Sequence, residues 1–129
     1  AEQIVKCAIG MAQEMAARIL LIYVVEKTAV PEKFRDEHGD ALPEHFYEDE
    51  YARTVGQWVT VIKNAGVSCQ EVPAYGDPIK EILTAAKSRK ADYIMMGARE
   101  LRGLRRLRAI SSVSRNVIEK AAIPVIAVP

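Results

Sequence analysis

The residues with the clearest chemical potential lie in the last third of the chain. Gly97 ends the short apolar run Tyr93–Met96, and a basic loop follows it. Serines then open the next segment, at Ser111, Ser112 and Ser114. A glycine lets the backbone approach a ligand closely, and the first turn of a helix presents free N–H groups to an anion. This order of strand, glycine, loop and helix start is typical of a phosphate site in an α/β domain.

The loop between the glycine and the serines is strongly cationic. Its arginines are Arg99, Arg102, Arg105, Arg106 and Arg108. Guanidinium groups bind phosphate oxygens through paired hydrogen bonds, so they could replace backbone amides as phosphate ligands. A solvated basic loop at the carboxyl edge of the sheet is the alternative, and the sequence alone leaves both open.

The hydrophobic pattern predicts the elements that position these residues. Helical spacing of apolar residues begins at Ile4 and ends near Ala16. The continuous apolar run 18–25 is typical of a strand buried on both faces, as in parallel sheets. A long polar connection follows, and then a helix that ends at Gly66. The apolar face of that helix is Ala52, Val55, Val59 and Ile62.

The second half of the chain continues the alternation of strand and helix. Strand 67–74 contains Pro73, which favours a position near the edge of a sheet. Asp77 and Pro78 are the residue types expected at the cap and the first position of a helix. The predicted buried stripe of that helix is Ile79, Ile82, Leu83 and Ala86.

Strand 92–96, a further helix and strand 124–128 complete the pattern. The inward face of the last helix is expected to consist of Val113, Val117, Ile118 and Ala121. At 129 residues, this alternation predicts one α/β domain, an open parallel sheet with helices on both faces.

Composition and charge exclude several classes of protein. A formal net charge of +1 gives no general attraction to nucleic acid or to a membrane surface. No apolar run approaches the ~20 residues that cross a bilayer. Cys7 and Cys69 fit no metal or redox spacing, so we expect two buried, reduced thiols in a cytoplasmic protein.

Residues with catalytic or metal-binding spacing are not evident in the sequence. There is no Ser-His-Asp order and no phosphate-loop lysine. His38 and His45 stand among many carboxylates between residues 32 and 50, but their spacing matches no ligand pattern. We therefore expect a solvated acidic segment there, no metal site and no enzymatic activity.

Two segments resemble the universal stress protein family. Residues 74–97 carry a Gly-acidic-Pro helix start and an Ala-Asp-apolar-Met-Gly strand, and residues 111–128 carry a Ser-Val-Ser helix start and a Pro-Val-apolar-Val strand. The resemblance implies a Rossmann-like sheet of strand order 3-2-1-4-5. Because no segment here supplies the central first strand, we expect native residues upstream of Ala1, and so an incomplete family domain over residues 1–129.

The resemblance also implies a nucleotide site, with departures from the pattern. Relatives that bind ATP carry Gly, two residues, Gly, nine residues and then Gly-Ser or Gly-Thr. Here Gly97 matches the first glycine, Glu100 takes the place of the second, and Ser111 that of the third, one residue late. A carboxylate at the second position repels a triphosphate, and a serine resists positive φ. The implied binding residues for ATP with magnesium are Val24, Val25, Gly97, Arg99, Arg102, Ser111 and Ser112.

The last strand is apolar and uncharged from Ile123 to Pro129. An open apolar edge strand invites aggregation, and the resemblance implies that a partner subunit covers it in a homodimer. The resemblance, with these departures from the ATP-binding pattern, therefore implies a dimeric stress-response interaction module with protein partners and without tight ATP binding. The alternative is an ATP-binding switch or weak ATPase with an arginine-modified phosphate loop.

Overall fold

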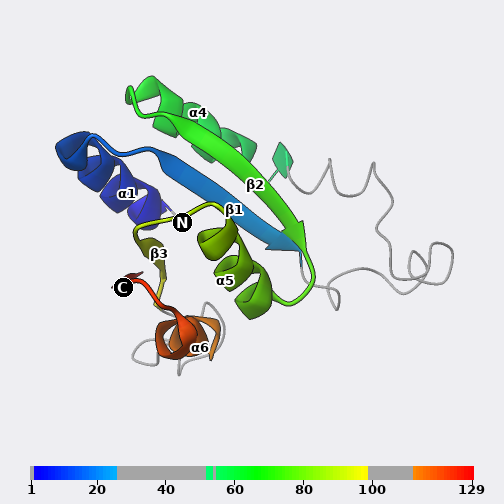
Figure 1. The fold of residues 1–129 in the computed structure, drawn as a ribbon. Coiled ribbons are helices and arrows are strands. Elements are labelled where there is room, and N and C mark those ends of the chain that lie inside the picture. Colours follow the sequence, from blue (N-terminus) through cyan, green and yellow to red (C-terminus); the bar gives the residue numbers. More distant parts are fainter. Residues whose placement is uncertain (1, 26–51, 54, 99–111) are drawn as a thin grey trace, which may run out of the picture.

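A computed structural model describes residues 2–25, 52–53, 55–98 and 112–129 (Figure 1). Its elements are α1 (Glu2–Met15), β1 (Ile19–Val25), α4 (Gly56–Asn64), β2 (Cys69–Tyr75), α5 (Pro78–Ser88), β3 (Ile94–Gly97), α6 (Ser112–Lys120) and β4 (Val125–Val128). The predicted alternation of helices and strands is confirmed, each element ending within a few residues of its expected position. The acidic segment before α4 and the arginine loop before α6 lie outside the described residues.

The described strands form two parallel pairs. β1 pairs with β2 in a register that runs from Ile19 opposite Cys69 to Val25 opposite Tyr75. β3 pairs with β4 from Ile94 opposite Val125 to Gly97 opposite Val128. The parallel α/β architecture is therefore confirmed. Within the described ranges β1 and β3 are not paired with each other, so the full order 3-2-1-4-5 stays a prediction.

Helices α1 and α4 pack together on one face of the β1–β2 pair. Their contact buries a cluster of Val5, Ala12, Ile62 and Val67, with partly buried Ile9, Ile19, Leu21, Trp58 and Cys69 around it. Ile19 and Leu21 reach this cluster because alternate residues of a strand point to the same face. Trp58 packs against this core cluster.

Helix α5 covers the same strand pair from the other side and also contacts α6. Figure 1 shows α5 in front of β1 and β2, with α4 behind them. The start of α5 is as predicted: the backbone N–H of Lys80 donates to Asp77 Oδ2 at 3.1 Å, and Pro78 occupies the first helical position. Its apolar stripe is half-buried instead of buried.

Three further residues that were predicted to be buried are exposed. Ile118 is 43% exposed because Val117 and Ser114, at 0% and 1%, define the inward face of α6, and Ile118 lies about 100° further round the helix. Cys7 is exposed, since it stands about 200° around α1 from the buried Val5. Ala52 is also exposed and precedes α4.

The second cysteine, Cys69, is half-buried beside the core cluster. Burial raises the pKa of its thiol above the usual value, and the Glu71 carboxylate adds to that effect. The Lys63 ammonium opposes both by favouring the thiolate. Burial is the largest cause, so this thiol keeps its proton to higher pH than a solvated one.

Candidate functional site

The candidate site lies at the carboxyl end of β3, where Gly97 is the last residue of the strand. The backbone N–H of Ala98 donates to the carbonyl of Val128 at 2.9 Å, so pairing with β4 continues one residue beyond β3. This bond fixes the direction in which the chain leaves the sheet. The predicted phosphate loop therefore follows a residue, Ala98, whose backbone is hydrogen-bonded to β4.

A buried serine joins the first turn of α6 to this strand end. Ser114 is 1% exposed, and its Oγ donates a hydrogen bond to the Gly97 carbonyl. Ser112, the first residue of α6, is exposed, and its carbonyl accepts a hydrogen bond from the Asn116 side chain at 2.7 Å. The first N–H groups of a helix have no partner within the helix. The structure thus brings the first turn of α6 to Gly97, and anion binding there stays a prediction.

Gly97 also lies in the contact between α1 and β3. A Cβ built on Gly97 would stand 3.1 Å from Ile4 Cδ1, in the first turn of α1. The positive-φ glycines of the described chain are Gly66 and Gly76, so Gly97 is not required by its backbone conformation. Its lack of a side chain lets α1 approach β3 closely. The sequence predicts this glycine as an opening for a ligand, whereas the structure gives it a helix–strand contact.

Two of the residues that the family resemblance implies for ATP binding, Val24 and Val25, lie at the carboxyl end of β1. Val25 is 5% exposed and Val24 is half-buried. The Val25 carbonyl accepts the N–H of Gly76 at 3.0 Å, which ties this end of β1 to the turn after β2. Adjacent strand residues point to opposite faces, so Val24 and Val25 cannot both line one face of a base. Their strand pair is separate from that of Gly97.

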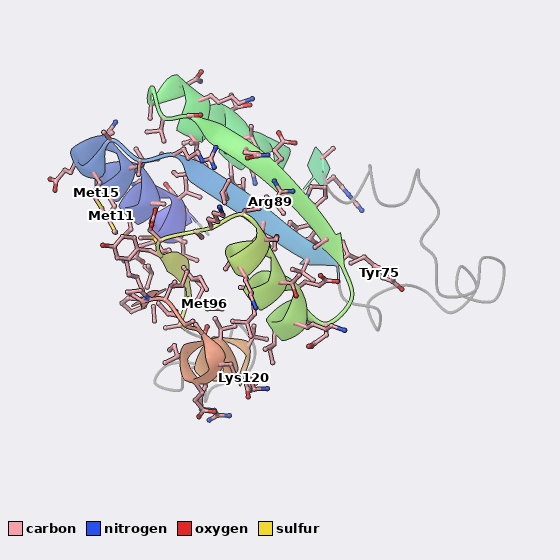
Figure 2. The ribbon with its side chains drawn as sticks, in the orientation of Figure 1. Met11, Met15, Tyr75, Arg89, Met96 and Lys120 are labelled. Atoms are coloured by element: carbon pink, nitrogen blue, oxygen red, sulfur yellow. The ribbon has the colours of Figure 1, made fainter. Side chains whose placement is uncertain are left out.

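A polar group also lies at this end of the β1–β2 pair. Tyr75 stands opposite Val25 in the register, and its hydroxyl is buried without a hydrogen-bond partner among the described residues. Figure 2 shows the Tyr75 side chain projecting beyond the end of β2. Buried hydroxyls are normally hydrogen-bonded, so this group is distinctive in the described part of the chain.

The predicted site residues are thus only partly brought together. Ser112 is two residues before Ser114, which binds the Gly97 carbonyl, while Val24 and Val25 belong to the other strand pair. Arg99, Arg102 and Ser111 lie outside the described residues. The sequence placed Ser114 at the predicted helix start but did not predict its burial or its bond to Gly97, and it indicated no role for Ile4. A signal existed for Ser114: it precedes the inward Val117 by three residues, and a serine on an apolar helix face needs a hydrogen-bond partner. No pattern indicated that Ile4 would meet Gly97.

Charged groups add little to this site in the described ranges. The ion pair there, Lys6 Nζ to Glu2 Oε1 at 3.5 Å, joins two highly exposed side chains on α1 and contributes little to stability. No group of histidine, cysteine and carboxylate side chains that could hold a metal ion occurs among the residues described. Of the helices in the described part, none is long and apolar enough to cross a membrane.

Comparison with known sequences gives a match over the whole chain. The sequence model of the universal stress protein family matches residues 1–129. Universal stress protein YxiE of Bacillus subtilis (strain 168) is 27% identical over 129 residues, which cover 94% of this chain and 85% of the relative.

Solved structures with the same fold include two with high overlap. Hypothetical protein MJ0577 superposes with a TM-score of 0.78 at 23% identity, covering 98% of this chain and 85% of that one. The universal stress protein from Archaeoglobus fulgidus in complex with dAMP has a TM-score of 0.70 at 21% identity, covering 99% and 86%. At these identities the likeness shows the fold.

Substituting the buried serine tests the link between α6 and β3. Ser114→Ala removes the hydrogen bond to the Gly97 carbonyl, so we expect the free energy of unfolding to fall by about 1–3 kcal/mol in guanidinium denaturation. Ser112→Ala is the matched control on the same helix turn. Because Ser112 is exposed, its loss should stay within about 0.5 kcal/mol. Equal losses in both variants would contradict the assigned role of Ser114.

A double-mutant cycle tests the close contact of α1 with β3. Gly97→Ala places a methyl against Ile4 Cδ1, and Ile4→Val removes that methyl. We expect the double variant to be more stable than the sum of the single effects by about 0.5–1 kcal/mol. The coupling is the quantity to measure, since Gly→Ala also changes the entropy of the unfolded chain. Additive effects would mean that the two residues are not in contact.

Proposed function

Because the chain belongs to the universal stress protein family, we propose that it acts as a cytoplasmic, dimeric interaction module of the stress response, without tight ATP binding. The observation that carries this proposal is the outer edge of β4. This strand pairs on one side with β3, and its other edge is unpaired within the described chain. A second copy of β4 would cover that edge.

The hydrogen bonds to β3 define which groups of β4 face outward. The Ile94 N–H donates to the Pro124 carbonyl at 3.0 Å, and the Ala98 N–H donates to the Val128 carbonyl at 2.9 Å. Backbone groups of successive residues point to opposite edges of a strand. The N–H and C=O groups of Val125 and Ala127 therefore face away from β3.

The side chains of β4 suit a buried interface. The strand reads Val-Ile-Ala-Val, without a charged residue that would discourage pairing. Val128 is buried, and the other three residues are half-buried. A paired copy would satisfy the outward backbone groups and remove more apolar surface from water. Both effects favour association of two copies through this edge.

The packing of Gly97 supports the nucleotide-independent part of the proposal. The Cβ direction of this glycine meets Ile4, and its carbonyl accepts the Ser114 hydrogen bond. Internal contacts thus use two sides of the residue that a phosphate would have to approach. Glu100 in place of a second glycine adds a negative charge to the predicted loop.

An ATP-binding switch or weak ATPase is the second candidate. It is favoured by the start of α6 beside Gly97 and by the dAMP complex of the Archaeoglobus fulgidus relative. In this case Ser112 and the first turn of α6 would bind phosphate, and Val24 or Val25 would wall the adenine. Arg99, Arg102 and Ser111 would complete the site for ATP with magnesium.

A proline in β4 tests the proposed dimer edge. Ala127→Pro removes an outward N–H while leaving the bonds to β3 in place. We expect the dimer dissociation constant, measured by sedimentation equilibrium, to rise at least about tenfold, which corresponds to about 1.4 kcal/mol. Ala127→Val keeps the N–H and is the control. An unchanged dissociation constant for Ala127→Pro, or a wild-type protein that is monomeric at high concentration, would contradict the proposal.

Calorimetric titration with ATP and magnesium separates the two candidates. If the chain is an interaction module, we expect no saturable binding below about 1 mM ATP. This limit corresponds to a binding free energy weaker than about −4 kcal/mol. Micromolar binding would instead establish the second candidate. Charge reversal of Arg99 and Arg102 should then weaken binding more than about tenfold if guanidinium groups replace the missing glycines.

A further inference from the structure

Helix α1 carries two apolar stripes with different environments. Val5, Ile9 and Ala12 belong to the core cluster or pack against it beside α4. A second stripe lies about 100° away around the helix and consists of Ile4, Ala8, Met11 and Met15. Ile4 meets Gly97, and α1 contacts β3 and β4, so this stripe is the side of α1 that faces the β3–β4 pair.

All four methionines of the chain lie on these two touching elements. Met11 and Met15 are on α1, and Met95 and Met96 are on β3. The Cβ direction of Gly97 points to α1, so Met95, two residues earlier, shares that face and Met96 points away. Figure 2 shows Met11 and Met15 near the end of α1, and Met96 on the side of β3 toward α6.

The methionines differ in exposure. Met15 is 49% exposed, whereas Met11, Met95 and Met96 are half-buried. Met11 stands one helical turn before Met15, on the same stripe. A dissolved oxidant therefore reaches the Met15 thioether first. It reaches the Met11 thioether only when this side of α1 moves away from the β3–β4 pair.

We propose that Met15 and Met11 form an oxidant-responsive modification site that controls how tightly α1 packs on β3. The reagent is hydrogen peroxide: a lone pair of the thioether sulfur attacks one peroxide oxygen, the S–O bond forms, the O–O bond breaks, and water leaves. The sulfur loses two electrons and the peroxide gains them. The product is methionine sulfoxide, which cellular reductases convert back.

The two positions respond differently because their surroundings differ. A sulfoxide at Met15 remains solvated and disturbs little. A sulfoxide at Met11 places a polar S=O group against the β3–β4 face, where it lacks water. The helix must then move away from β3 to hydrate it, which weakens the contact of Ile4 with Gly97. This inference does not depend on the proposed function, since it rests on the exposure of the methionines and on the contact of α1 with β3.

Peptide mapping by mass spectrometry during peroxide treatment of the folded chain tests the order of reaction. We expect Met15 sulfoxide to form at least about threefold faster than the sulfoxides of Met95 and Met96, with Met11 second. The same chain in denaturant supplies the reference rates, which should be nearly equal. Folded rates that are also equal, or faster oxidation on β3, would overturn the proposal.

The consequence for packing is tested by unfolding the oxidised proteins. Oxidation of Met11 and Met15 should lower the denaturant midpoint, and methionine sulfoxide reductase should restore it. The peroxide exposure is limited so that Met95 and Met96 stay unmodified, as peptide mapping reports. Met11→Leu removes the reactive sulfur at similar volume, so its midpoint should then not respond to peroxide. Met15→Leu is the matched control and should still respond through Met11. A Met11→Leu variant as sensitive as wild type would overturn the assigned role of Met11.

Discussion

The close approach of three elements at Gly97 is the contact on which the carboxyl end of the β3–β4 pair depends. α1 reaches the strand because Gly97 has no side chain, and α6 is held there by the buried Ser114 hydroxyl. Interiors are packed so tightly that one added methyl must displace a neighbour. A methyl added at Gly97 would require the Ile4 side chain to shift, and loss of the Ser114 hydroxyl would remove the hydrogen bond that ties α6 to this strand end.

The same contact shapes what the site can do. A helix start beside a strand end is suited to an anion, and a glycine at that position would normally serve the ligand. In this chain the Cβ direction of Gly97 meets Ile4 of α1, and the Gly97 carbonyl accepts the Ser114 hydroxyl. Both contacts lie within the protein, beside the first turn of α6. The described residues thus keep the parallel α/β architecture of the family at this strand end.

The two faces of α1 illustrate a division between stability and responsiveness. The face toward α4 is built from Val5, Ile9 and Ala12, which cannot be oxidised under mild conditions. The face toward β3 carries flexible methionines at its exposed end. Methionine adapts to irregular surfaces and changes polarity on oxidation. Helix α1 contacts both strand pairs, but only its face toward β3 carries oxidisable side chains. Its contact with β3 can therefore weaken while its contact with α4 and β1 is kept.

The sequence by itself determined the order of elements, the cap of α5 and the parallel character of the strands. These features depend on local patterns: apolar periodicity, a long apolar run at β1, and Asp77-Pro78 at a helix start. It could not determine the burial of Ile118 or Cys7, because a shift of one residue turns a helical side chain by about 100°. Nor could it determine that Ile4 meets Gly97 or that Ser114 binds its carbonyl, since these partners are far apart in sequence. Only tertiary packing decides which faces meet, and here it places Ile4 of α1 against Gly97.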